Sequence, residues 1–171
     1  MQRLFFSLKF SHAQQQQLLA YQQQVQALCP GARSVDVSNL HLTLFFLGLV
    51  SEQQKLQLLE ATNSIIAQRF SLTLDRLAGF AKPKIVYLAP STIPAELVQL
   101  QQQMATLSKA QGFTDIHDSY RPHVTLARHA VFSESVAVEP IRLEISEYAL
   151  YVSENNNGKV QYSPLHIVSM L

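Results

Sequence analysis

The chain has 171 residues, of which 47% are hydrophobic, which is enough for one compact domain or for two small lobes that share a core. Lysine and arginine total 13 against 12 acidic residues. The resulting net charge of +1 cannot hold a long nucleic-acid duplex by counterion release, so a nucleic-acid ligand would need a local pocket. The single cysteine, Cys29, excludes an internal disulfide and a cysteine-based metal site.

The first half of the chain alternates between strand and helix patterns. Residues 3–10 are rich in Phe and Leu and predict a strand, and the glutamine-rich stretch after them has apolar residues at helical spacing, Leu18, Tyr21, Val25 and Leu28. The apolar segment 40–49 predicts a buried strand. A second helix begins after Ser51, which can cap it, and the alternating residues 71–74 predict another strand.

The second half repeats this order. Residues 84–88 predict a short strand, a helix begins near Pro94 and has apolar residues at helical spacing, and residues 122–126 predict the next strand. Two further strands, 141–152 and 160–168, are separated by Asn157 and Gly158, a step typical of a hairpin turn.

Two nearly identical tetrapeptides show that this repetition is a duplication. His41-Leu42-Thr43-Leu44 and His123-Val124-Thr125-Leu126 are 82 residues apart, and the strands that open the two halves are offset by about the same distance. We therefore expect the two halves to be related by a pseudo-twofold axis.

Side chains two residues apart in a strand point to the same face, so each copy presents one imidazole and one hydroxyl together. If the two strands lie side by side, His41 and His123 converge on one cleft with Thr43 and Thr125. One imidazole can then act as a base while the other, protonated, acts as an acid. The hydroxyls can donate hydrogen bonds to a phosphate on which negative charge develops.

The paired motifs carry a family resemblance. The segments 39–48 and 121–128 resemble the 2H phosphoesterase superfamily, and within it the bacterial RNA 2′,3′-cyclic phosphodiesterases, also called 2′-5′ RNA ligases; further similarity lies in residues 3–6, 72–74 and 162–165. The resemblance implies an α+β fold in which two pseudo-symmetric lobes, each an antiparallel sheet flanked by helices, surround a central cleft. It also implies that residues 1–171 form a single bilobal domain.

The same resemblance implies the chemistry. It makes His41 the catalytic base and His123 the catalytic acid, gives Thr43 and Thr125 the role of holding the phosphate, and assigns Arg128 to phosphate or nucleotide binding. The expected reaction is metal-independent hydrolysis of 2′,3′-cyclic phosphates on RNA ends or small nucleotides to 2′-phosphates, with possible 2′-5′ ligation. No cofactor is implied.

Strand alternation also predicts where two further side chains point. In a regular strand Arg128 would point to the same face as the core residues Val124 and Leu126. It reaches the cleft only if a bulge or the end of the strand follows Ala127. We expect such an irregularity because burying an unpaired guanidinium is costly. Phe45 has the same strand alternation as His41, which makes it a candidate for stacking on a base, although an aromatic residue in an apolar strand more often packs in the core. Arg33, Lys82, Lys84 and Arg121 are further candidates for guiding phosphates, but no pattern selects any one of them.

Two alternatives remain at this stage. The first is a metal site in the crowded segment that holds Asp115, His117, Asp118, His123 and His129, although the spacing lacks the helical His pair of zinc sites. The second is a non-catalytic module that binds a nucleotide or RNA end. Related phosphodiesterases also act on ADP-ribose cyclic phosphates. No run of about 18 apolar residues occurs, so we expect no membrane contact. We also expect a cytoplasmic protein and a monomer.

Overall fold

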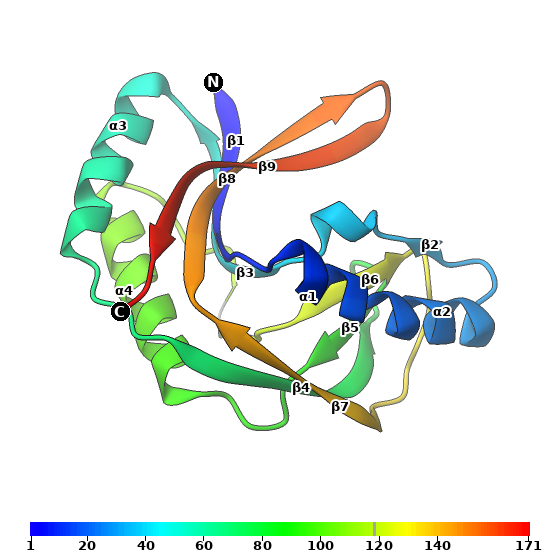
Figure 1. Ribbon diagram of the computed structural model, residues 1–171. Coiled ribbons are helices and arrows are strands. Elements are labelled where there is room, and N and C mark those ends of the chain that lie inside the picture. The colour runs from blue at the N-terminus through cyan, green and yellow to red at the C-terminus, as the bar shows by residue number, and fades with distance from the viewer. Residues whose placement is uncertain (118) are drawn as a thin grey trace.

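The computed structural model describes residues 1–117 and 119–171, which form two antiparallel sheets (Figure 1). The first sheet has the order β3-β1-β8-β9, from Leu42–Val50, Gln2–Leu8, Glu147–Asn156 and Lys159–Ser169. The second has the order β2-β6-β5-β4-β7, from Arg33–Ser34, Val124–Arg128, Ile85–Ala89, Phe70–Phe80 and Val136–Ile145. One continuous cluster of buried apolar side chains extends through both sheets.

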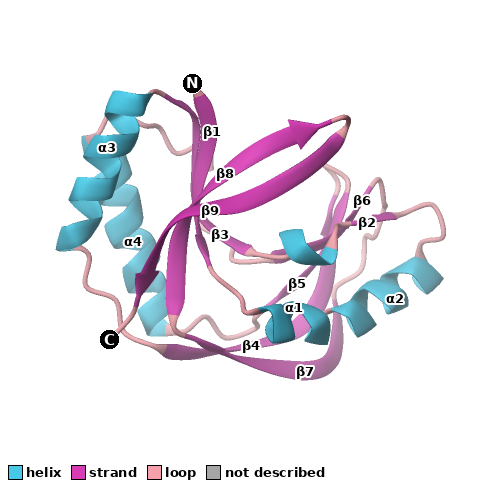
Figure 2. Cartoon of the chain, turned by 45° about the horizontal axis from the view of Figure 1, so that its top comes forward, coloured by secondary structure: helices cyan, strands magenta, loops and turns pink. Residues whose placement is uncertain are grey.

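Four helices flank these sheets in the described part of the chain. Figures 1 and 2 show α1 (His12–Gln17) and α2 (Leu19–Leu28) at one side of the molecule and α3 (Glu52–Ala61) and α4 (Ala95–Ala110) at the other. Ser51 caps α3 as predicted, because its hydroxyl accepts a hydrogen bond from the amide of Gln54. No helix of the described residues is long and apolar enough to cross a membrane.

The two sheets are related by the internal duplication. The order β3-β1-β8-β9 corresponds to β6-β5-β4-β7, and in each sheet the strand that follows the motif histidine pairs with the opening strand of its repeat. This confirms the predicted α+β arrangement of two antiparallel lobes. The helices are exchanged between the lobes, however, since α2 from the first repeat packs on β6 and α4 from the second packs on β3.

One predicted strand proved wrong. The segment 141–152 is divided at Ser146 into the end of β7 and the start of β8, which belong to different sheets. The apolar pattern continues across this residue because both strands are half-buried, so alternation alone cannot locate the crossing. The hairpin between β8 and β9 is confirmed: Asn157 and Gly158 both have positive φ, 55° and 85°, as a two-residue turn with two left-handed positions requires.

Each motif strand contains a β-bulge directly after the threonine, and β3 has a second register shift at Leu47. Phe6 pairs with Phe45 and Ser7 with Thr43, which leaves Leu44 as the extra residue of β3. In β6 the same shift leaves Leu126 as the extra residue, between the pairs that Thr125 and Ala127 make with β5. A bulge reverses the alternation of the residues that follow it. The side chains of the next two residues, Phe45 and Phe46 in β3 and Ala127 and Arg128 in β6, therefore point to the opposite faces from those expected of a regular strand.

Two buried glutamines bind the carbonyl groups of these bulges. Gln22 of α2 donates through Nε2 to the oxygen of Leu126 at 3.0 Å and to the oxygen of Val35 at 2.7 Å. Gln101 of α4 donates to the oxygen of Leu44 at a longer 3.4 Å. The oxygen of Leu126 also accepts from the backbone amide of Val35 at 2.9 Å, so Gln22 is its second donor. The exchanged helices thus add side-chain hydrogen bonds at both bulges, where the regular ladder is disrupted.

This predicts different stability effects for two adjacent glutamines of α2. Gln22→Met keeps the side-chain volume but removes a donor to two carbonyl oxygens, that of Val35 and that of Leu126, which retains only the Val35 amide; the free energy of unfolding should fall by about 1–3 kcal/mol. Gln23→Met, on the exposed face, serves as the matched control with a change of about 0.5 kcal/mol or less. Urea denaturation measures both; equal losses in the two variants would contradict the assigned hydrogen bonds.

Candidate active site

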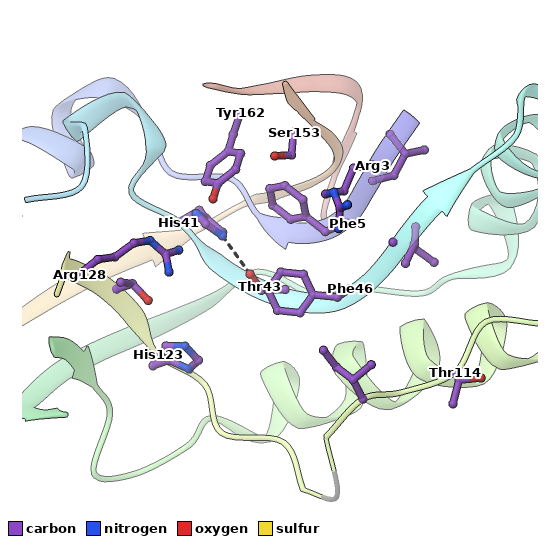
Figure 3. Close-up of a pocket in the computed structure, with 15 residues that line it drawn as sticks. Arg3, Phe5, His41, Thr43, Phe46, Thr114, His123, Arg128, Ser153 and Tyr162 are labelled. Carbon is purple, nitrogen blue, oxygen red and sulfur yellow. Dashed lines mark hydrogen bonds between the residues drawn. The ribbon is translucent and has the colours of Figure 1, made fainter. Parts of the chain in front are cut away.

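The two His-x-Thr motifs line one cavity of about 430 Å³ between the sheets (Figure 3). His41 and Thr43 reach it from the start of β3, and His123 and Thr125 from the start of β6. Each histidine directly precedes the first residue of its strand, so the two copies of the motif occupy equivalent positions in the two sheets. The structure thus brings together the four motif residues that the sequence singles out.

Both imidazoles are held by the backbone two residues before them. His41 Nδ1 lies 2.7 Å from the carbonyl oxygen of Asn39, and His123 Nδ1 lies 2.7 Å from that of Arg121. A carbonyl oxygen only accepts, so Nδ1 carries the proton and donates in both rings. In the neutral imidazole this leaves the lone pair on Nε2. The Nε2 of His41 lies 2.9 Å from the hydroxyl of Thr43, which donates to it when the ring is neutral.

Aromatic rings flank each histidine. Phe5 and Tyr162 lie 5.1 and 5.0 Å from the ring of His41, measured between centroids. Around His123 the corresponding rings are Tyr87 and Phe80, both at 5.3 Å. Phe5 and Tyr87 are separated by the 82-residue offset of the repeat. The duplication has therefore preserved an aromatic wall beside each imidazole as well as the imidazole itself.

These apolar surroundings determine the charge of the two rings. The pKa of His41 is lowered to about 4, mainly by burial and in smaller part by the nearby His123 and Arg128, against the opposing effect of the Asn39 carbonyl. Burial also lowers the pKa of His123, with smaller contributions from His117 and Arg128 in the same direction. Without a bound anion, His41 is therefore neutral at neutral pH, in the protonation state of a base.

Asn39 fixes the surroundings of His41. Its side-chain amide donates to the carbonyl oxygen of Val160 at 2.7 Å and accepts from the amide of Tyr162 at 3.1 Å, while its own carbonyl binds the His41 ring. One buried residue thereby holds both the imidazole and the strand that carries its aromatic neighbour. Neither alternation nor the repeat predicted this role, because Asn39 precedes the strand.

Arg128 reaches the cavity, as a bulge would require. Leu126 and Ala127 are both buried, and Arg128 is exposed and lines the cavity beside His41 (Figure 3). The irregularity lies at Leu126, slightly earlier than expected. Of the other candidate cations, Lys82, Lys84 and Arg121 do not line this cavity, and Arg33 lies on β2 opposite Arg128.

The expectation for Phe45 was wrong. Its side chain is only 4% exposed and belongs to the core, because the bulge at Leu44 reverses the alternation before it. The adjacent Phe46, 44% exposed, lines the cavity in its place (Figure 3). Phe46 follows His41 by five residues, as Arg128 follows His123, so the two bulges place equivalent positions in the cavity.

The crowded acidic and histidine segment forms no metal site within residues 1–117 and 119–171, where no group of three or more His, Cys, Asp or Glu side chains is arranged to hold an ion. Asp118, one of the candidates, lies outside the described residues. The ring neighbours of His123 are aromatic rather than carboxylate.

Comparison with known proteins agrees with this geometry. A family model described as the 2′-5′ RNA ligase superfamily matches residues 12–157. A protein of Escherichia coli (strain K12) named RNA 2′,3′-cyclic phosphodiesterase is 31% identical over 96% of this chain and 94% of its own length, and one of Aeropyrum pernix with the same name is 31% identical over 56% of each chain. The crystal structure of E. coli LigT complexed with 3′-AMP has a TM-score of 0.87 at 30% identity, and the match covers 99% of this chain and 98% of that one. The chain belongs to the 2′-5′ RNA ligase superfamily.

Proposed function

We propose that this protein hydrolyses 2′,3′-cyclic phosphates on RNA ends to 2′-phosphates, with His41 and His123 as base and acid and without a metal ion. The observation that carries the proposal is the convergence of two backbone-anchored imidazoles and two threonines on one cavity. The relatives named RNA 2′,3′-cyclic phosphodiesterase support an enzyme of this class over a non-catalytic binding module.

His41 is suited to the base because burial keeps its ring neutral and its proton lies on Nδ1, which leaves the lone pair on Nε2. It removes a proton from water as the water oxygen attacks phosphorus and the bond from phosphorus to O3′ breaks. The hydroxyl of Thr43, which occupies Nε2 in the free protein, is released to donate to a non-bridging phosphate oxygen. Thr125 supplies the equivalent donor from the second motif.

His123 is suited to the acid, giving the Nε2 proton to O3′ as it leaves. Its lowered pKa disfavours the charged ring in the free protein, but a phosphate anion bound beside it favours the imidazolium. The bound substrate thus promotes protonation of His123, which then protonates the leaving O3′. The products are a 2′-phosphate and a 3′-hydroxyl, and a proton exchange with solvent restores both histidines. With a 5′-hydroxyl in place of water, the same displacement leaves a 2′-5′ linkage.

The first test replaces each histidine. His41→Ala and His123→Ala should each lower kcat on a nucleoside 2′,3′-cyclic phosphate by about 10²-fold to 10⁴-fold, because each removes one proton-transfer group. His166→Ala, an exposed histidine of β9 outside the cavity, is the matched control and should retain activity. Phosphorus NMR of the product identifies the oxygen that keeps the phosphate. Full activity of His123→Ala would remove the proposed acid.

Treatment with a chelator completes this test. Activity should persist after dialysis against EDTA, since the proposed chemistry needs only the side chains of the cavity. Loss of turnover that returns on addition of a divalent cation would contradict metal independence. Assaying an ADP-ribose cyclic phosphate alongside RNA ends then separates the two substrate classes.

The pH dependence follows from the two lowered pKa values. Activity requires neutral His41 and protonated His123, so kcat/KM should fall below about pH 4, where His41 becomes charged, and again above the pKa of His123, which lies below the ordinary value near 6.5. The maximum of kcat/KM therefore lies on the acid side of 6.5, and that of kcat lies at higher pH because bound phosphate raises both pKa values. Arg128→Gln removes a nearby cation and should move the alkaline limb to higher pH; a shift to lower pH would refute this assignment.

The correction from Phe45 to Phe46 gives a prediction about base stacking. Phe46→Ala should raise KM and lower kcat/KM about 5-fold to 100-fold, because stacking contributes about 1–3 kcal/mol per base, whereas Phe46→Tyr keeps a ring and should restore most of the loss. Leu49→Ala, exposed on the same strand but outside the cavity, is the control. An unchanged KM in Phe46→Ala would exclude this residue from base binding.

A further inference from the structure

A second cavity, of about 450 Å³, adjoins the first one. One side of it is formed by β2 and the end of β6. The other side is formed by the turn of the β8–β9 hairpin, which contributes Gly158, Lys159 and Val160. His41, Thr125, Arg128 and Tyr162 line both cavities. A ligand that reaches the two histidines can therefore extend into either cavity.

The lining of the second cavity is cationic. Arg33, Arg128 and Lys159 contribute exposed positive side chains, His129 lies beside them, and Asp36 is the single acid among the lining residues. The Asp36 carboxylate is engaged with Ser38, accepting from its amide at 2.9 Å and its hydroxyl at 2.6 Å. Within the described residues, no ion pair involves Arg33, Arg128 or Lys159. The three cations are thus available to an anionic ligand.

The backbone brings two of these cations together. Arg33 and Arg128 are direct partners across the antiparallel pair β2–β6, an arrangement that is destabilising for like charges in the absence of an anion. The next residue, His129, has φ of 56°, a left-handed conformation that ends β6 and leaves this side chain in the cavity lining. Adjacent guanidinium groups are well suited to a phosphate, which each can bind through two hydrogen bonds.

The two cavities differ in chemistry on either side of the histidines. The first has the apolar side chains of Phe5, Phe46, Leu47 and Ile116 in its lining, beside Arg3 and Arg128, and suits a base. The second gathers the cations Arg33, Arg128 and Lys159 and suits a phosphate. A mononucleotide with a 2′,3′-cyclic phosphate has a base but only one phosphate, which the histidines and threonines already bind. An RNA end carries another phosphate, the phosphodiester on the 5′ side of its terminal nucleoside.

We propose that Arg33 and Lys159, with Arg128 at the junction of the cavities, bind this upstream phosphodiester, and that the preferred substrate is an oligonucleotide rather than a mononucleotide. The inference rests on the proposed function, because it assumes that the cyclic phosphate lies between the two histidines. The cationic cavity then determines the direction in which the RNA chain leaves the active site, past β2 and the β8–β9 turn.

A kinetic comparison of three substrates tests the proposal. A dinucleotide that ends in a 2′,3′-cyclic phosphate should have kcat/KM at least tenfold above that of the mononucleotide, and a dinucleotide with an uncharged methylphosphonate linkage should resemble the mononucleotide. The double substitution Arg33→Ala, Lys159→Ala should abolish the preference for the charged dinucleotide and reduce its dependence on salt concentration. Lys109→Ala, an exposed cation at the end of α4, is the control and should keep the preference.

A binding measurement separates this proposal from the proposed reaction. Calorimetry on the intact protein should find that adenosine 3′,5′-bisphosphate binds at least tenfold more tightly than adenosine 3′-monophosphate, and that the double variant loses the difference. These probes need no turnover, so they report on the second cavity even if hydrolysis fails. Turnover without any preference for the charged dinucleotide, or equal affinity for both probes, would overturn the second phosphate site and leave the proposed function intact.

Discussion

The active-site cavity depends on one backbone irregularity that occurs twice, the single-residue bulge after each motif threonine. A regular strand would place the residue five positions after each histidine in the core, with the leucine of the motif. The bulge instead makes positions one, three and four after the histidine buried and returns position five to the cavity. Phe46 and Arg128, the two side chains that differ between the halves, enter the cavity by this means.

The bulges also explain why the helices are exchanged between the lobes. Each bulge has a carbonyl that accepts a hydrogen bond from a buried glutamine of the other half of the chain, in β6 together with the amide of Val35. Tyr120 adds a further link, since its hydroxyl donates to the carbonyl oxygen of Thr43 at 2.9 Å. Each motif strand is therefore held by elements of the opposite repeat, and separating the lobes would leave buried carbonyls without donors.

The sequence was sufficient to predict where the side chains of the repeated motif point, but not where the side chains after the bulges point. The repeated tetrapeptide predicted four cavity residues because its alternation is regular up to the threonine. Neither bulge contains Gly or Pro, so no residue type indicates it. For Arg128 the cost of burying a charge indicated an irregularity, whereas no such cost arises for Phe45, and the same irregularity in β3 therefore went undetected. The crossing at Ser146 was missed for a related reason, since both strands remain apolar.

The duplicated fold supplies two nearly equivalent imidazoles, but acid–base catalysis needs them to differ. The ring environments are alike, with two aromatic neighbours and one backbone carbonyl for each. Burial lowers the pKa of both rings, to about 4 for His41, and Arg128 lowers both as well. The position five residues after each histidine differs, since it is Phe46 in the first half and Arg128 in the second. In the proposed reaction, a phosphate bound beside Arg128 offsets that cation and favours the imidazolium of His123. The proposed separation of base binding from phosphate binding then follows from one repeated position, which is aromatic in one half and cationic in the other.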